Sequence, residues 1–412
     1  MHSRSRAASM ALAFWLPHPP FEGNNMVNRV TRGRAFAAVA AVGVLSVTLA
    51  ACSSGSSSSD SSSAAASAPA ESAPAASAPA AGGEVAVSLI TKDSTNPFFV
   101  AMQNGAKQAA DKLGIQLTIA SGKQEGDDAG QIAAIENAVA QGQKGILITP
   151  MSTNVNDAIS KARAAGLYVI ALDTPTDPPD VVNITFATDN FLAGEAIGQW
   201  SAGKLNGAKA TIAELIIFND KVVSVDYNRA NGFMTGMGIK VPDVTKIGSS
   251  ATTGKYTTGK GGDYEVACIE ATGANEEGGQ KGMETCLSKN PNINLVYTIN
   301  EPTAAGAANA LKAAGKTIGK DVVIVSVDGG KAGVENVKAG IIGATSQQYP
   351  LLMADKGVQA IFDFANSGTE AKVTEGKAFF DTGVNLCTDD PQTTVTAAPQ
   401  KDAQYCIDNA WG

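Results

Sequence analysis

Short runs rich in apolar and β-branched residues alternate with longer segments of helical periodicity along most of this chain. Such alternation is typical of βαβ units, in which helices connect parallel strands. The expected strands are 85–90, 116–120, 145–149, 167–172, 211–217, 294–299, 321–327 and 341–346. The expected helices lie near 97–112, 128–141, 154–165, 226–239, 276–289, 303–314 and 331–338. The pattern therefore predicts the α/β fold class.

The alternation falls into two series, the second of which starts near Ala210. Two doubly wound lobes with parallel sheets are the natural interpretation. We expect the glycine-rich stretch 248–280 to be a loop insertion that carries one disulfide. No helix-turn-helix pattern precedes the first series, which argues against a DNA-reading module.

Polar side chains recur directly after the expected strands. TKDSTNPFF follows the first strand and TPMS, with Thr149 at its start, the third, and Asp173, Asn300, Asp328 and the pair Gln347 and Gln348 follow later strands. Ligands of open parallel sheets bind outside the carboxyl ends of strands, so this edge is the expected binding site. Neither Gly-x-Gly-x-x-Gly nor the phosphate-binding Gly-x-x-x-x-Gly-Lys-Ser/Thr order occurs there, and we expect no cofactor.

These side chains suit a neutral sugar, which presents apolar ring faces and an equator of hydroxyl groups. Asp173 and Asp328 can each accept two hydroxyl hydrogen bonds, and Arg229 can donate with its rigid fork. Asn300 and Gln348 can donate and accept, while Phe98 and Phe99 can stack on a ring face. Structural roles stay open for most of them: helix caps (Asn96, Asn300), core packing (Phe98, Phe99), turns (Asp173, Asp328) and a solvated or lobe-bridging position (Arg229).

The N-terminal region is expected to direct export. Arg29, Arg32 and Arg34 precede the apolar run 35–49, and Leu49-Ala50-Ala51-Cys52 closes it. This order resembles a bacterial lipoprotein signal, which predicts a signal peptide over 1–51, cleavage before Cys52 and lipid on Cys52. The alternative, a transmembrane helix, would need roughly 18 to 20 apolar residues, more than this run contains. Met26 is a better start for a signal of ordinary length.

Residues 52–83 are almost entirely Ser, Ala, Pro and Gly, so we expect a disordered tether rather than a folded segment. Cleavage would remove His2 and His18, which are both histidines of the chain. Serine or cysteine catalysis with a histidine base, and histidine-based zinc sites, are then excluded. The net charge of −8 becomes more negative when five arginines and one glutamate leave with the signal, which argues against nucleic acid as a partner.

The five cysteines are accounted for by one lipidated residue and two disulfides. We favour Cys268 with Cys286 and Cys387 with Cys406, because each pairing closes a short loop. Four cysteines allow three connectivities, and sequence does not choose among them. The spacing is too wide for a C-x-x-C redox pair, and we expect no metal site.

The ordered set TKDSTNPFF, ILITPMS, ALDT, ATDNFLAGEAIG, NRANGF, YTINEPTAAGA, VSVDGG and TSQQYP resembles the periplasmic ribose-binding-like sugar-binding proteins of ABC transporters. The resemblance spans residues 84 to about 375 and is greatest to the fructose-binding branch, on the evidence of YTINEP and the cysteine-bearing insertion. It implies the type I periplasmic binding protein fold, with two lobes joined by three crossing segments that act as a hinge. The implied first lobe is 84–188 plus about 349–376, and the second 189–348 plus about 377–412.

The resemblance also implies roles for individual residues. It assigns Phe98 and Phe99 as the stacking pair and the following as polar contacts: Asn96, Thr149, Asp173, Arg229, Asn300, Asp328 and Gln348. Thr174 stands where ribose binders commonly have an arginine, which removes one donor. Trp200 and Tyr256 are further aromatic candidates, with Trp200 expected in the core.

The expected function is capture of a monosaccharide outside the cytoplasm, with fructose first and ribose or another pentose or hexose as alternatives. The protein would be a lipid-anchored monomer that delivers the sugar to an ABC permease with a cytoplasmic ATPase and catalyses no reaction. One alternative is a sensor subunit for a chemoreceptor or kinase. Another is a carbohydrate enzyme that uses Asp173 and Asp328 as its two carboxylates.

Overall fold

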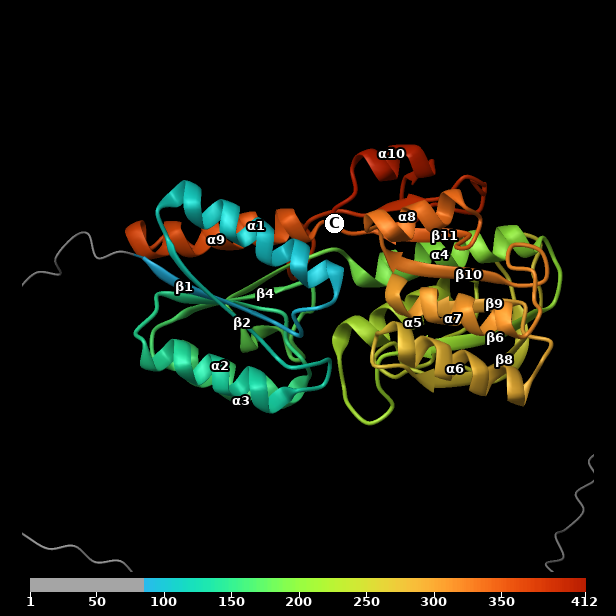
Figure 1. The fold of residues 1–412 in the computed structure, drawn as a ribbon, viewed down its shortest axis with the longest axis horizontal. Helices are drawn as coiled ribbons and strands as arrows, with labels where there is room; N and C mark the ends of the chain where they lie inside the picture. The colour runs from blue at the N-terminus through green and yellow to red at the C-terminus, as the bar shows by residue number, and fades with distance from the viewer. Residues whose placement is uncertain (1–84) are drawn as a thin grey trace, which may run out of the picture. The chain divides into compact units, whose positions relative to one another are not determined.

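Residues 85–412 are described by a computed structural model, in which two α/β lobes are built on separate sheets (Figure 1). The expected signal peptide, the lipidated Cys52 and the tether 52–83 lie outside the described residues. Within 85–412, every helix is too short or too polar to cross a bilayer.

The first lobe is built on a six-stranded parallel sheet of order β12-β5-β4-β3-β1-β2. Helices α1 (Pro97–Leu113) and α9 (Pro350–Ser367) cover one face, and α2 (Asp128–Ala140) and α3 (Asn156–Ala164) cover the other (Figure 1). The strands are β1 (Ala86–Thr91), β2 (Gln116–Ser121), β3 (Gly145–Ile148), β4 (Tyr168–Leu172), β5 (Ile184–Ala187) and β12 (Phe380–Asp381).

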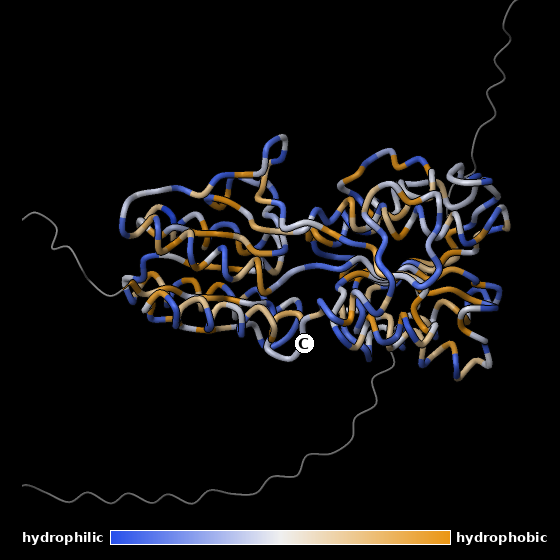
Figure 2. Tube along the Cα trace, turned by 90° about the horizontal axis from the view of Figure 1, so that it is seen from above, coloured by the Kyte–Doolittle hydropathy of each residue, from blue (hydrophilic) through white to orange (hydrophobic). Residues whose placement is uncertain are grey.

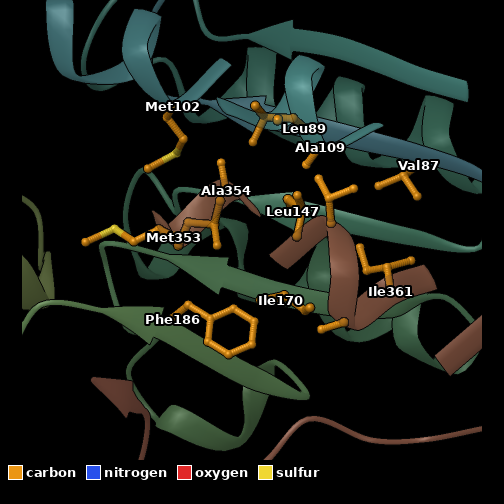
Figure 3. Packing of buried hydrophobic residues seen from close by; sticks show 14 of the residues in the cluster. Val87, Leu89, Met102, Ala109, Leu147, Ile170, Phe186, Met353, Ala354 and Ile361 are labelled. Carbon is orange, nitrogen blue, oxygen red and sulfur yellow. The ribbon is translucent and has the colours of Figure 1, made fainter. Parts of the chain in front are cut away.

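The central strands of this sheet are buried on both faces, which explains why they are continuous apolar runs. On the α1 and α9 side, Leu89, Leu147 and Ile170 pack against Met102 and Ala354 (Figure 3). On the other side, Ile146 and Ile148 pack against residues of α2 and α3. Hydrophobic stretches recur along the trace with hydrophilic segments between them (Figure 2).

The second lobe is built on an eight-stranded sheet of order β14-β13-β11-β10-β9-β6-β8-β7. Helices α4 (Asn190–Leu205) and α5 (Ser224–Gly236) pack on one face, and α6 (Glu276–Lys289), α7 (Glu301–Ala313) and α8 (Lys331–Lys338) on the other. The short α10 (Ala403–Asp408) contacts α8. The strands are β6 (Ala210–Ile216), β7 (Thr253–Tyr256), β8 (Gly262–Ala271), β9 (Leu295–Thr298), β10 (Val323–Asp328), β11 (Ala344–Gln347), β13 (Asn385–Cys387) and β14 (Gln400–Lys401).

The chain passes between the two sheets three times: between β5 and α4, between β11 and α9, and between β12 and β13. The predicted fold class, two α/β lobes joined by three segments, is therefore confirmed. Because β12 pairs with β5, the first sheet continues to Asp381, a few residues past the limit of 376 expected for that lobe.

The expectation of a loop over 248–280 is wrong. This stretch contains β7 and all of β8, which form an antiparallel pair, and β8 also pairs in parallel with β6. Most positions of β8 are half-buried or exposed, because β8 lies next to the edge of the sheet. Charged residues therefore interrupt its apolar pattern, and the sequence shows no continuous hydrophobic run.

Two disulfides join Cys268 to Cys286 and Cys387 to Cys406, the pairings that we favoured. Their Cα atoms are 5.6 and 6.1 Å apart. The first joins β8 to α6, and the second joins β13 to α10 and so ties the C-terminal segment to the second sheet.

Candidate functional site

The carboxyl ends of both sheets border one cavity. In the first sheet the crossover direction changes between β1 and β3, and in the second between β6 and β9. Such switch points are where doubly wound folds bind ligands. The lining residues come from both lobes: Lys92, Asn96, Phe98, Phe99, Glu125, Asp173, Ile217, Val225, Arg229, Ala274, Ile299, Asn300, Asp328 and Gln348.

Eight of the nine residues expected to contact a ligand line this cavity; Thr149 does not. Thr149 is fully buried, and its backbone carbonyl accepts a hydrogen bond from Gln131 Nε2 at 2.8 Å. Gln131 also accepts from the backbone N–H of Met151. Thr149 therefore belongs to the hydrogen bonding that secures the segment after β3.

Arg229, on α5, is the central cation of the site. Its guanidinium lies 3.3 Å from Asp173 Oδ1 and 3.9 Å from Asp328 Oδ1, so it bridges carboxylates from the two lobes. Nε donates to Asn190 Oδ1 at 2.8 Å, and Nη1 donates to the carbonyl of Ile299 at 3.0 Å. These contacts fix the direction of the fork. The lobe-bridging alternative therefore holds for this residue, and the ligand-binding role stays a prediction that its place in the cavity lining permits.

Close packing of α4 against α5 positions Arg229. A Cβ on Gly194 would lie 2.1 Å from the Arg229 carbonyl oxygen, and a Cβ on Gly198 equally close to that of Phe233. From the facing helix, Gly232 and Gly236 approach α4 in the same way. Glycines at these positions let the two backbones touch, which fixes α5, and Arg229 with it, closely against α4.

Asp328 ends β10 in a strained conformation, with φ of 148°. Gln348 Nε2 donates to its Oδ1 at 3.1 Å. Burial raises the pKa of Asp328 to about 7; Arg229 opposes the shift and Asp173 adds to it. A ligand that donates hydrogen bonds to this carboxyl would favour its ionised form.

Glu301 holds the turn that follows Asp328. Its two carboxyl oxygens accept from the backbone N–H groups of Gly329 and Gly330 at 2.8 and 3.0 Å, and Thr345 Oγ1 donates to it at 2.8 Å. Burial, and next the neighbouring Asp328, raise the pKa of Glu301 to about 8. Glu301 therefore supports the strained backbone of Asp328 from outside the cavity lining.

Asp173 follows β4 with a left-handed backbone, at φ of 64°. Thr174 Oγ1 donates to Asp173 Oδ2 at 2.8 Å, and Asn190 Nδ2 donates to its carbonyl oxygen at 2.9 Å. One carboxyl oxygen thus faces Arg229 while the other is held by its chain neighbour. Thr174, which does not itself line the cavity, therefore holds the carboxyl group of Asp173 in place.

Asn96 and Asn300 both cap helices and line the cavity. Asn96 Oδ1 accepts from the Phe98 N–H at 3.0 Å, and Asn300 Oδ1 accepts from the Thr303 N–H at 3.0 Å. Asn300 Nδ2 also donates to the carbonyl of Ala274 at 2.9 Å. The structural alternative and the site role are compatible at these two positions.

Phe98 and Phe99 are 4% and 5% exposed and meet edge to face, with ring centroids 5.5 Å apart. Phe98 also packs edge to face on Trp411, at 5.3 Å between centroids, and Trp411 Nε1 donates to the carbonyl of Gln348 at 3.0 Å. The C-terminal tryptophan therefore supports the first-lobe phenylalanine and a second-lobe wall of the cavity together. Sequence reasoning missed it, because its position depends on the path of the tail after the last crossing.

Lys92 and Glu125 also line the cavity and were missed, although both follow strands. Lys92 comes directly after β1, within the TKDSTNPFF stretch, and Glu125 lies in the loop after β2, whose end was not among the predicted site positions. Lys92 Nζ and Glu125 Oε1 are 3.0 Å apart. The position of Glu125 after a strand would have indicated it, whereas Lys92 stood in a stretch already assigned to the site and was not singled out.

Trp200 and Tyr256 lie in the core of the second lobe, as expected for Trp200. Trp200 Nε1 donates to the carbonyl of Asp390, and the Tyr256 hydroxyl donates to that of Ala208, both at 2.8 Å. Neither residue lines the cavity. Over residues 85–412, acidic, histidine and cysteine side chains form no cluster suited to a metal ion.

Comparison with known proteins places the chain in a family. The family described as periplasmic binding protein domain matches residues 87–370. The ribose import binding protein of Salmonella typhimurium is 29% identical over 66% of this chain and 82% of its own length. The galactofuranose-binding protein of Escherichia coli is 33% identical over 56% and 66%. These relatives are named as binding proteins, not as enzymes.

Solved structures agree on the fold. A galactofuranose binding protein superposes with a TM-score of 0.63 at 23% identity, covering 79% of this chain and 98% of its own. A myo-inositol binding protein from Caulobacter gives 0.62 at 20% identity, covering 75% and 94%. The branch that binds fructose stays a prediction. The matched region contains every residue that lines the cavity, and the chain belongs to the periplasmic binding protein domain family.

Proposed function

We propose that this protein captures a monosaccharide outside the cytoplasm and delivers it to an ABC permease driven by a cytoplasmic ATPase. One observation carries the proposal: two carboxylates, an arginine, amides and a phenylalanine pair from the carboxyl ends of both sheets line one cavity. The relatives named for ribose import and galactofuranose binding support a sugar as the ligand.

The chemistry of the cavity lining favours a small neutral polyol, because carboxylates, amides and an arginine lie beside aromatic side chains. Hydrogen bonds between sugar hydroxyls and charged groups contribute roughly 1.5 to 3 kcal/mol each. Four or five such bonds would give micromolar affinity after ordering and desolvation costs.

In this proposal the first lobe contributes Asn96, Phe98, Phe99 and Asp173, and the second lobe contributes the residues after its strands. Arg229, Asn300, Asp328 and Gln348 form that second set. Since each lobe holds part of the constellation, a ligand completes its contacts only when the lobes are shut. Binding therefore shifts the population toward the shut form.

Fructose is our first candidate, with ribose or another pentose or hexose next. The YTINEP motif and the cysteine-bearing segment favour the fructose-binding branch. Thr174 argues against ribose itself, because the donor expected of ribose binders is missing there.

The proposed location is the outer side of the cell membrane. Lipid on Cys52 would anchor the protein, and the tether 52–83 would let a monomeric body reach the permease. The two disulfides support an oxidising compartment.

The test is a thermal-shift screen of the purified protein with fructose, ribose, allose, mannose, xylose, galactose and myo-inositol. We expect one or two strong stabilisers, since a ligand that binds the folded state raises its melting temperature. No stabiliser among the sugars, or turnover of any of them, would contradict the proposal. Loss of sugar uptake in cells that lack the protein, restored by the gene, would separate transport from sensing.

A further inference from the structure

We propose that Lys92 and Glu125 form a ligand-selecting subsite, which takes one sugar hydroxyl beyond those served by Asp173 and Asp328. The inference rests on the proposed function and deepens it. Both residues line the cavity, yet they come from the ends of β1 and β2, apart from the strands that carry the other charged groups. We name them the Lys92–Glu125 pair.

The Lys92–Glu125 pair is almost completely removed from solvent, with side chains 3% and 8% exposed. Removing an ion pair from water costs several kcal/mol per ion, and the attraction between the partners often fails to offset that cost. Two apolar residues of the same size would hold these loops together at least as well. A purely structural role therefore explains the pair poorly.

The surroundings make the cost larger. Glu125 is close enough to Asp93 and Asp173 for their charges, together with the larger effect of burial, to raise its pKa; Lys92 opposes the shift. A third carboxyl beside the cavity is unfavourable unless something else uses it. Carboxylates with perturbed environments in a cleft are typical of binding sites.

The pair has hydrogen-bonding capacity left over. An ammonium group carries three donors and a carboxylate about four acceptor positions. Within residues 85–412 the two side chains have only each other as polar partners, at 3.0 Å. A hydroxyl group can accept from Lys92 Nζ and donate to Glu125 at once, so a donor and an acceptor side by side match it.

The loop that carries Glu125 also contacts the second lobe. Glu125 precedes Gly126, whose carbonyl oxygen accepts from Lys221 Nζ of the second lobe at 2.6 Å. Lys221 also pairs with Asp128, at 3.0 Å. These contacts are made by the backbone of Gly126 and by the side chain of Asp128, so the side chain of Glu125 takes no part in them.

The experiment measures the coupling between each side chain and each hydroxyl of the sugar. The probe is whichever sugar of the thermal-shift panel has the lowest Kd, with its monodeoxy analogues, titrated by calorimetry into wild type, Lys92→Met and Glu125→Gln. We expect one deoxy position to cost wild type about 10- to 100-fold in Kd. Removal of the same hydroxyl should raise the Kd of each variant less than about threefold. Removal of any other hydroxyl should raise the Kd of the variants as much as it raises that of wild type.

Lys221→Met is the matched control, because it removes a neighbouring lysine outside the cavity lining. It should weaken all analogues by a common factor and leave their ranking unchanged. If the Lys92 and Glu125 variants also weaken every analogue equally, or change none, the subsite is wrong. If Lys92→Met or Glu125→Gln fails to fold, the conservative variant Lys92→Arg or Glu125→Asp is used in its place. The same selective loss of sensitivity to one hydroxyl is then expected. Failure of every sugar to bind wild type would instead overturn the proposed function.

Discussion

The two lobes meet in two regions of different chemistry: the cavity and the rim around it. In the cavity, Arg229 lies between Asp173 and Asp328, and the side chains of all three residues are at most 6% exposed. At the rim, Lys221 pairs with Asp128, with 22% and 15% of their side chains exposed. Both regions bridge the lobes, but the charged groups of the cavity are buried and those of the rim are partly exposed.

Other rim contacts join the two lobes directly. The Thr153 N–H donates to the carbonyl of Val222 at 3.3 Å, the Ser224 hydroxyl donates to the carbonyl of Pro175, and the Tyr227 hydroxyl donates to Asp177 at 3.3 Å. We infer that the two regions have different roles. Cavity residues set which ligand binds and how tightly, and rim residues set how readily the lobes stay shut.

Replacing Arg229 with Met should have the largest effect. Two buried carboxylates would lose their cation, and breaking a buried ion pair by removing one partner costs about 3 to 5 kcal/mol. Urea unfolding should show this loss, and sugar binding should disappear. Lys255→Met, which breaks the exposed pair with Asp263, is the control and should change neither quantity. Unchanged stability of the Arg229 variant would mean that the cavity charges are solvated rather than buried.

Replacing Asp328 with Asn should separate binding from folding. The amide keeps the shape but loses charge-assisted acceptance, so we expect Kd to rise about 10- to 100-fold. The melting temperature without sugar should stay near wild type, since the buried carboxyl is costly when ionised. Calorimetry and a thermal melt check the two parts. Collapse of the unliganded variant would show that Asp328 is structural.

A change in pH should shift the contributions of the two regions to folding stability in opposite directions. The pKa of Asp328 is raised from its ordinary 3.8 to about 7, so the folded state holds a proton that the unfolded state has lost. Its contribution to stability is present below about pH 4 and is lost as pH rises through about 7. Hydroxyl donors favour the carboxylate, so sugar affinity should rise over the same interval.

At the rim, partial burial works to raise the pKa of Asp128, but hydrogen bonds from Asn154, Lys221 and Ser152 hold it below its ordinary value. Its contribution is therefore present above that value and is lost as pH falls. Calorimetry between pH 5 and 8 should show affinity rising in wild type and nearly flat in Asp328→Asn. Equal slopes in both proteins would assign the pH dependence to another group.

Replacing Lys221 with Met should have the smallest effect. Partly exposed ion pairs contribute about 0.2 to 1 kcal/mol, so Kd should rise at most about two- to fivefold for every sugar alike. Stopped-flow measurements should place the change mainly in the dissociation rate. A larger, sugar-dependent loss would erase the distinction between rim and cavity.

Sequence reasoning located the site because one rule of parallel sheets applies to both lobes. Residues after buried strands share an edge, so Asp173, Asn300, Asp328 and Gln348 were predictable without coordinates. The same rule applied to β2 would have found Glu125. Thr149 satisfies the rule yet lies outside the cavity lining, because position after a strand does not fix the direction of a side chain.

Other features depend on long-range packing that no local pattern shows. Trp411 reaches Phe98 only after the third crossing and the disulfide between Cys387 and Cys406 set the path of the tail. β8 was missed because its position near the sheet edge permits charged residues within a strand. The close contact that the glycines of α4 and α5 allow can be recognised only when the two helices are known to face each other.

The most direct measurement is a crystal structure of the protein grown with the sugar that stabilises it most in the thermal-shift screen. We predict one sugar ring in the cavity, beside Phe98 and Phe99, with hydroxyl oxygens within 3.2 Å of Asp173, Arg229 and Asp328. Sugar bound elsewhere, or held by only one lobe with those three side chains turned away, would contradict the assignment of this cavity.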